Sequence, residues 1–256
     1  MTARILIIAG SDSGGGAGIQ ADIKTVTMLG GHAMTAITAI TAQNTLGVQA
    51  VHAVPADMVI AQIDSVVSDI GVDAVKIGMI GSAETAERVA ERLTAISVPI
   101  VFDPVMVATS GSVLADARTI AAFGQLMDIA ALVTPNMPEL SALGGTAPVL
   151  RHGCHLLVKG GHADGAVVVD TLISPSGQQR HWEGKRFDTD DTHGTGCTLA
   201  SAIATGLGQG MAIGDAVERA IRFVRLAILS APGLGQGHGP LGQQGVTDYL
   251  FGDNEP

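Results

Sequence analysis

The sequence predicts an α/β fold in which a central, mostly parallel sheet is covered by helices on both faces. Short apolar runs alternate with segments of helical periodicity along the chain, the pattern of successive strand–helix–strand units. Of the 256 residues, 46% are hydrophobic but only 3% aromatic, which suits a parallel sheet built from Val, Ile, Leu, Ala and Met. No linker or change of composition divides the chain, so we expect one domain over residues 1–256.

The predicted elements follow one another in this alternating order. Apolar runs bounded by glycine, proline or polar residues indicate strands, at 4–10, 34–41, 48–54, 74–81, 99–106, 131–136 and 155–162. Two later runs, 166–174 and 178–186, indicate a hairpin. Helical spacing of apolar residues predicts helices, at 19–31, 58–70 (with Asp57 as N-cap), 83–96, 199–210 and 215–231.

Several predicted strands end in the same kind of residues. Glycine or polar side chains follow the strands at 10–12, 78–79, 103–104, 134–136 and 159–162. In open parallel sheets, ligands bind in the crevice at the carboxyl ends of the strands. We therefore expect the binding site along this edge of the sheet.

Charge and cysteine content restrict the partners and the compartment. A formal net charge of −10 makes nucleic acid and anionic membrane surfaces poor partners, so a small molecule is expected. No apolar run reaches the ~20 residues that span a bilayer, and MTARILIIAG runs directly into a strand rather than forming a signal peptide. The two cysteines, Cys154 and Cys197, make no disulfide framework, and RHGCH at 151–155 lacks the second ligand cluster of a zinc site. We predict a cytoplasmic protein with free thiols.

A glycine-rich segment, AGSDSGGGAGIQAD at 9–22, joins the first predicted strand to the first predicted helix. It fits neither GxGxxG nor GxxxxGK[ST], the two common nucleotide-binding fingerprints. Glycines nevertheless let a backbone approach a ligand closely, and a helix N-terminus favours anions. We expect this segment to close over a ligand, with a flexible turn as the alternative.

Two later strand ends carry residues suited to metal and phosphate chemistry. Asn136 and Glu139 lie three residues apart in TPNMPEL, and a carboxylate with a nearby amide can organise water around Mg²⁺. Alternatively, Glu139 only stabilises the positive end of a helix that starts near Pro138. Lys159 in KGGH can neutralise phosphate charge, or remain a solvated lysine.

The segment DTHGTGCTLASA at 191–202 places a cysteine where a helix is expected to begin. Two glycines before a helix leave backbone N–H groups unpaired, and such a cluster can hold a developing negative charge. Cys197 lies at the positive end of the helix, where the pKa of a thiol is expected to fall. His193 is near in sequence, but the sequence does not place its ring. The alternative is a buried structural cysteine.

Eight motifs occur in a single order over nearly the whole chain: AGSDSGGGAGIQADIKT, ITAQNTLGV, VKIGMIGS, VFDPVMVATSG, TPNMPE, VKGGH, THGTGCTLASAIA and GHGPL. With these motifs the chain resembles the ribokinase-like superfamily of small-molecule kinases. Within it, the chain most closely resembles the bacterial hydroxymethylpyrimidine/phosphomethylpyrimidine kinases of thiamine biosynthesis.

This resemblance implies a reaction, cofactors and an assembly. The family transfers the γ-phosphoryl of ATP, with Mg²⁺, to the hydroxymethyl group of 4-amino-5-hydroxymethyl-2-methylpyrimidine. It then phosphorylates the monophosphate to the diphosphate. The resemblance also implies a central parallel sheet, an active site at its carboxyl edge and a homodimer.

The resemblance further assigns pyrimidine contacts. Gln43 of AQNT is expected to hydrogen-bond the aminopyrimidine ring. Asp22 of IQAD and Met79 of IGM correspond to other ring contacts, and Val105 of DPVM lines the same pocket.

Phosphate and metal roles follow from the same resemblance. Lys159 and the loop DTHGTG, with Thr192 and Thr195, are expected to bind the ATP phosphates. Asp103 and Glu139 are expected to organise Mg²⁺ through water.

The catalytic position implied by the resemblance is Cys197, which stands where ribokinase-type GAGD motifs carry aspartate. It would accept the proton of the attacking hydroxyl, while Gly194 and Gly196 turn backbone donors toward the moving phosphoryl. Phosphoryl transfer places little covalent demand on a protein, which is compatible with this role. One departure is a short segment between TPNMPE and VKGGH, so the family's adenine contacts are not carried over there.

Two other functions compete with this one. Vitamin B6 kinases share the DPVM, TPN and HGTG elements, so pyridoxal is an alternative or second substrate. A non-catalytic pyrimidine-binding or regulatory protein is the other alternative, and the intact HGTGC loop and Lys159 argue against it.

Overall fold

The computed structural model of this protein describes residues 1–108, 111–162 and 165–246. The family motif VFDPVMVATSG extends into residues 109–110, which lie outside the described residues. The strands are β1 Arg4–Asp12, β2 His32–Asn44, β3 Gly47–Ala53, β4 Ala74–Ile77, β5 Ile100–Phe102, β6 Leu132–Val133, β7 His155–Val158, β8 Val167–Ile173 and β9 Gln179–Lys185.

All nine strands form one sheet in the order β3-β2-β1-β4-β5-β6-β7-β8-β9. Neighbouring strands from β2 to β7 are parallel. The pairs β2–β3, β7–β8 and β8–β9 are antiparallel. The predicted mostly parallel sheet is therefore confirmed, as is the hairpin of β8 and β9.

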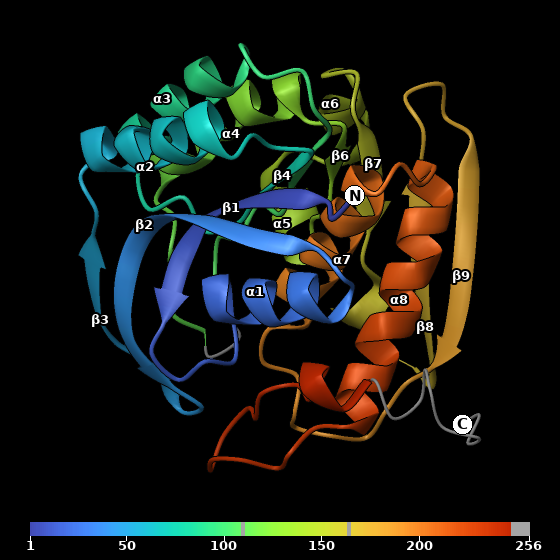
Figure 1. Ribbon diagram of the computed structural model, residues 1–256. Coiled ribbons are helices and arrows are strands. Elements are labelled where there is room, and N and C mark those ends of the chain that lie inside the picture. Colours follow the sequence, from blue (N-terminus) through green and yellow to red (C-terminus); the bar gives the residue numbers. More distant parts are fainter. Residues whose placement is uncertain (109–110, 163–164, 247–256) are drawn as a thin grey trace.

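Helices cover both faces of this sheet (Figure 1). They are α1 Gly18–Met28, α2 Ala56–Asp69, α3 Ala83–Leu93, α4 Ala117–Ile129, α5 Met137–Ala142, α6 Thr146–Leu150, α7 Thr195–Gly208 and α8 Ile213–Leu229, with 3₁₀ turns η1 Gly160–His162 and η2 Gln243–Val246. Alternate residues of β1 point to opposite faces. Leu6 and Ile8 pack in the core with α2, α3 and α4, whereas Ile5 and Ile7 pack with α1, α7 and α8. The sheet is thus buried on both sides, as expected for parallel strands.

Some predicted boundaries were wrong. Helix α2 begins at Ala56 with Pro55 as its N-cap, so Asp57 lies in the first turn rather than at the cap. The strands expected at 99–106 and 131–136 are only β5 and β6, because Pro104 and Pro135 cannot donate to a sheet ladder. Helix α4 was not predicted, α5 begins within TPNMPE at Met137, and the short segment after this motif contains α6.

Two irregularities in pairing lie where β1 and β2 approach their ends. The β1–β2 register shifts between Ala9 and Ser11, and the β2–β3 register shifts between Ala42 and Gln43. Such bulges redirect the following side chains and are frequent next to active sites. They bring Asp12 and Gln43 to the same edge of the sheet.

Within the described residues, no helix is long and apolar enough to cross a membrane.

Candidate active site

A cavity of about 870 Å³ runs along the carboxyl ends of the parallel strands. Its wall comes from segments that are distant in sequence, from the end of β1 to helix α8. It is lined by all but one of the predicted site residues: Gln43, Met79, Asp103, Val105, Glu139, Lys159, Thr192, Gly194, Thr195, Gly196 and Cys197. The convergence of strand ends at one edge places these side chains together.

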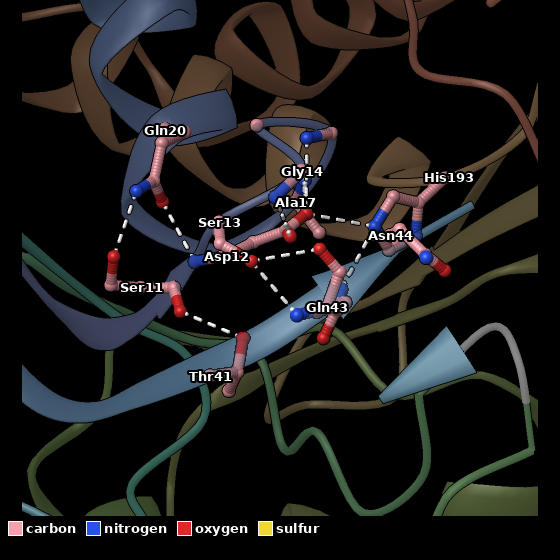
Figure 2. A network of polar contacts seen from close by, with 12 residues as sticks. Ser11, Asp12, Ser13, Gly14, Ala17, Gln20, Thr41, Gln43, Asn44 and His193 are labelled. Atoms are coloured by element: carbon pink, nitrogen blue, oxygen red, sulfur yellow. Dashed lines mark hydrogen bonds and ion pairs between the residues drawn. The ribbon is translucent and has the colours of Figure 1, made fainter. Parts of the chain in front are cut away.

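The loop after β1 is organised by the carboxylate of Asp12 (Figure 2). Its Oδ1 accepts a hydrogen bond from the backbone N–H of Gly14 at 2.8 Å. Its Oδ2 accepts from the backbone N–H groups of Gly16 at 3.0 Å and Ala17 at 2.9 Å. The glycine-rich loop is therefore held in one shape by a buried acceptor.

One part of the cavity wall contains Gln43, Met79 and Val105. The Met79 side chain crosses Gly10 so closely that a Cβ on Gly10 would lie 2.5 Å from Met79 Cε. The Thr38 hydroxyl donates to the Met79 carbonyl oxygen at 2.6 Å, which fixes the turn after β4. A side chain at position 10 would therefore displace the end of the Met79 side chain from this part of the wall.

Asp22 is the one predicted site residue that does not line the cavity. Its side chain is fully buried, and its Oδ2 pairs with Lys76 Nζ at 2.8 Å. The Ser201 hydroxyl donates to Asp22 Oδ1 at 2.6 Å. In this structure α1 turns the Asp22 carboxylate into the protein, and Lys76 is the member of the pair that lies at the cavity wall.

A second ion pair borders the cavity on the side of β5 and β7. Lys159 Nζ lies 2.8 Å from Asp103 Oδ1, which also accepts a hydrogen bond from the Thr134 hydroxyl at 3.0 Å. A Cβ on Gly196 would lie 3.3 Å from Lys159 Nζ and 3.5 Å from Asp103 Oδ2. The start of α7 therefore lies directly against this pair.

Glu139 lies in the first turn of α5, where it has a structural partner. Its Oε2 accepts from the Asn136 backbone N–H at 2.8 Å, and Asn136 Oδ1 accepts from the Glu139 backbone N–H at 2.8 Å. This capping box confirms that a helix begins beside Pro138. Burial raises the pKa of Glu139, against the opposing effect of the nearby Lys159 ammonium. Glu139 thus lies in the first turn of a helix, as the alternative expected, and it also lines the cavity.

The loop before α7 is packed against the loop after β1. Gly194 has a positive φ of 88°, and a Cβ there would lie 1.9 Å from the Gly16 carbonyl oxygen. A side chain at position 194 would therefore separate the two loops. The backbone N–H of Thr195, at the first position of α7, donates to the Thr192 carbonyl oxygen at 3.3 Å.

The predicted fall in the pKa of Cys197 is wrong. Removal from water raises the pKa of this thiol to about 11, and the negative charges of Asp22 and Asp103 act in the same direction. The Lys76 ammonium and a backbone contact at Gly18 oppose this rise without overcoming it. The position at a helix N-terminus is therefore outweighed by the surroundings, and the thiol is protonated at neutral pH.

The polar residues of the cavity wall that had no role assigned from the sequence include Asp12, Lys76 and His193. The His193 ring lies between Asp12 and Gln43, in contact with both. A lysine in the otherwise apolar run AVKIG was a usable signal, because a lysine in a buried strand needs a buried partner. No comparable signal connects residues 12 and 193 along the chain.

The remaining thiol and its neighbouring histidines lie elsewhere. Both cysteines are free, as predicted. Cys154 is buried in the core, where burial raises its pKa to about 11. The His152 Nδ1 lies 2.6 Å from Asp128 Oδ1 at the surface.

Comparison with known proteins connects this geometry to a family. Residues 12–242 match the family described as phosphomethylpyrimidine kinase. The hydroxymethylpyrimidine/phosphomethylpyrimidine kinase of Rhizobium meliloti is 46% identical over 258 residues, which cover 94% of this chain and 97% of that protein. The ThiED proteins of Corynebacterium efficiens and Geobacter sulfurreducens are longer, and the aligned region covers 36% and 51% of their lengths.

Solved structures share the fold. The Bacillus subtilis pyridoxal kinase in an ADP complex has a TM-score of 0.89 and 31% identity, with 96% of this chain and 99% of that chain covered. A phosphomethylpyrimidine kinase from Clostridium difficile has a TM-score of 0.76 and 38% identity, with 89% and 100% covered. The ribokinase-like fold and the kinase class expected from the motifs are thereby confirmed. The matched region includes every predicted site residue, and the chain belongs to the phosphomethylpyrimidine kinase family.

Proposed function

We propose that this kinase uses ATP to phosphorylate 4-amino-5-hydroxymethyl-2-methylpyrimidine and then phosphorylates the monophosphate to the diphosphate, in thiamine biosynthesis. The observation that carries the proposal is one cavity, in a member of this family, that combines Gln43 and Met79 with Lys159 and the glycine loop before Cys197. Relatives of similar length carry this activity in their names. Structural neighbours solved with ADP and with AMP-PCP support ATP as the phosphoryl donor.

In this proposal the ring of the substrate lies against Gln43, Met79 and Val105. Gln43 supplies the hydrogen-bonding amide, and the other two supply apolar contact area. Asp22 takes no part in this contact and instead neutralises Lys76 behind the wall.

The phosphates of ATP lie at the start of α7 and beside Lys159. Gly194 and Gly196 leave the backbone accessible there, and Thr192 and Thr195 border the same space. Lys159 exchanges its bond to Asp103 for bonds to phosphate oxygens, because an ammonium pairs with either kind of anion. Charge stabilisation of this kind is the main contribution that a protein makes to phosphoryl transfer.

Asp103 and Glu139 suit Mg²⁺ through their donor chemistry. Both are carboxylates at the cavity wall, and Mg²⁺ is commonly held by one or two carboxylates, phosphate oxygens and several waters. The ion would neutralise charge on the phosphates of ATP. The residues described here thus fit the predicted metal, with Lys159 supplying the adjacent positive charge.

Cys197 is proposed as the proton acceptor for the attacking hydroxyl. With a pKa near 11, only a small thiolate fraction performs this role at neutral pH. The backbone N–H groups around Gly194 and Gly196 act on the phosphoryl in parallel, whatever the charge of the sulfur.

We also propose a homodimer that works in the cytoplasm. Strand β2, the turn after it and the edge strand β3 expose the apolar side chains of Ile40, Leu46 and Val51, and contact with a second copy would remove such side chains from water. Light scattering on the purified protein tests the dimer. A monomer at micromolar concentration would contradict it.

A coupled assay of ADP release tests the function. The purified protein is offered hydroxymethylpyrimidine, its monophosphate and pyridoxal in parallel, each with ATP and Mg²⁺. Turnover of both pyrimidines is expected. Turnover of pyridoxal alone would favour the vitamin B6 kinase alternative, which structural neighbours named pyridoxal kinase support, and binding without turnover would favour a non-catalytic protein.

A further inference from the structure

One nitrogen of His193 contacts two side chains that require opposite hydrogen-bonding roles of it, one a donor and the other an acceptor (Figure 2). His193 Nε2 lies 2.9 Å from Asp12 Oδ2 and 3.0 Å from Gln43 Nε2. The ring is buried, between the loop after β1 and the end of β2. A single ring nitrogen is either a donor or an acceptor, so the two contacts cannot both be hydrogen bonds as drawn.

The charge state of Asp12 determines whether His193 Nε2 is a donor or an acceptor. The two oxygens of Asp12 accept three backbone hydrogen bonds, from the N–H groups of Gly14, Gly16 and Ala17, and acceptance from several N–H groups favours the charged form of a carboxyl. The carboxylate is therefore ionised at neutral pH and only accepts hydrogen bonds. His193 Nε2 must then carry the hydrogen that lies toward Asp12.

This hydrogen on His193 decides the orientation of the Gln43 amide. With a hydrogen on Nε2, the ring cannot accept from the Gln43 NH₂ group, and two N–H groups would face each other at 3.0 Å. A half-turn of the amide exchanges its oxygen and nitrogen, which occupy equivalent positions. The Gln43 oxygen then accepts from His193, in a bond shared with Asp12.

We propose that Asp12 and His193 are positioning residues that hold the Gln43 oxygen toward His193 and its NH₂ group toward the cavity, so that the site selects a ring that offers a hydrogen-bond acceptor. The substrate class is a heteroaromatic ring with an unprotonated ring nitrogen at that place. A ring with C–H or N–H there would meet the NH₂ group without a bond. This selection rests on the proposed pyrimidine kinase function, whereas the orientation itself does not.

The orientation is tested first, without any substrate. Long-range ¹H–¹⁵N spectra of the ¹⁵N-labelled protein report which nitrogen of each histidine carries hydrogen. The His193 signals are those lost in His193→Phe or, if that variant does not fold, those shifted in Asp12→Asn. We expect hydrogen on Nε2 across pH 6–8. A neutral ring with hydrogen on Nδ1 alone would overturn the proposal.

Selection is tested next with two deaza analogues of hydroxymethylpyrimidine, each with C–H in place of one ring nitrogen. In the unaltered protein, one analogue is expected to have a KM at least about tenfold higher than the parent compound, the effect of one lost hydrogen bond in a closed site. In His193→Phe and Asp12→Asn the amide can turn, so the ratio of KM values is expected to fall to about threefold or less, with kcat for the parent compound less affected.

His32→Phe is the matched control, because His32 is exposed at the opposite end of β2. It is expected to keep the selection of the unaltered protein. A ratio that stays unchanged in both His193→Phe and Asp12→Asn would overturn the proposal. If the protein phosphorylates neither pyrimidine, the proposed function fails, and the spectra still decide the orientation of the amide.

Discussion

Two lysine–carboxylate pairs lie beside Cys197 and differ in their access to the cavity. In both, the nitrogen–oxygen distance is 2.8 Å. Lys76 belongs to the cavity wall, yet both side chains of the Lys76–Asp22 pair are 0% exposed, so this pair is sealed from water, whereas 14% of the Lys159 side chain is exposed. A sealed pair cannot exchange its partner, but an open lysine can leave a carboxylate for a phosphate. Two pairs with the same nitrogen–oxygen distance therefore have different roles: Lys76–Asp22 is structural, and Lys159–Asp103 is suited to ligand binding.

The pKa values of the two lysines agree with this division. Burial lowers the pKa of an isolated ammonium, but Asp22, Cys197 and Asp103 together raise the pKa of Lys76 above its ordinary value. For Lys159 the corresponding groups are Asp103 and Glu139. Both lysines are thus cationic at neutral pH, and only their surroundings separate their roles.

The largest effect on stability is expected from Lys76→Met. It leaves the Asp22 carboxylate buried without its counter-charge, which destabilises by about 3–5 kcal/mol in comparable pairs. Urea unfolding followed by circular dichroism measures the loss. The double variant Asp22→Leu/Lys76→Met removes both charges and is expected to recover a large part of it. A double variant no more stable than Lys76→Met would show that the pair is not the cause.

Lys159→Met tests the open pair. We expect kcat to fall by about 10²–10³, the effect of removing one group that stabilises transition-state charge. The loss of stability is expected to be less than half that of Lys76→Met, because the Lys159 side chain is partly exposed and water can take its place beside Asp103. ADP release and urea unfolding on the same preparation measure the two effects. A stability loss equal to that of Lys76→Met would remove the distinction between the pairs.

Charged groups of both pairs affect the pKa of Cys197, and the expected pH dependence of kcat follows from this raised pKa. A thiol with a pKa of about 11 is deprotonated only as the pH rises, so the thiolate fraction grows about tenfold per pH unit below that value. We expect kcat to increase from pH 6 to 9 with this slope if the thiolate is the proton acceptor. A profile that is flat over this range would assign the reaction to the backbone donors.

Substitution of Cys197 refines this measurement. Cys197→Ala is expected to keep the KM for the pyrimidine and to lower kcat by about 10², the usual contribution of a general base. Cys197→Asp is expected to retain more turnover than Cys197→Ala, because aspartate also accepts protons. Equal rates for the two variants would argue against proton acceptance at this position.

The smallest effect is expected at a third pair, Arg4–Asp73, which is partly exposed to solvent. Arg4 is the first residue of β1, so this pair lies at the opposite end of the strands from the cavity. The Arg4 hydrogen bonds lower the pKa of Asp73 to about 2. Its stabilisation is therefore present above the ordinary pKa of aspartate and is lost as the pH falls toward 2. Asp73→Asn is expected to shift the urea midpoint only slightly at pH 7, and this shift is expected to shrink between pH 5 and pH 3. A shift as large as that of Lys76→Met would contradict the ranking by burial.

The sequence predicted the fold through features that are local in the chain. Alternation of apolar runs with helical spacing was enough for the α/β class and for most elements, including the β8–β9 hairpin. Helix α4 was not predicted. Asp116 caps it by accepting a hydrogen bond from the Thr119 backbone N–H at 2.8 Å, and an aspartate before a helical run is a signal visible in the sequence. The strand lengths at β5 and β6 were overestimated because the apolar runs continue into loops that line the cavity.

The site was predicted less evenly. The strand-end rule brought Asp103, Asn136 and Lys159 to one edge, and the structure places them at one cavity. It could not show which carboxylate faces the cavity, and Asp22 points away from it into the pair with Lys76. The shift in the pKa of Cys197 was predicted in the wrong direction. A helix terminus is visible in the sequence, whereas the removal of the thiol from water is not.

The sequence by itself determined the fold class, the order of the elements and the family, because these depend on patterns along the chain and on motif order. Only the tertiary structure decided which charges are sealed, which are open and how His193 joins Asp12 to Gln43. The physical reason is that burial and pairing depend on segments up to 181 residues apart. Free energies of charged groups follow that environment, and no local pattern encodes it.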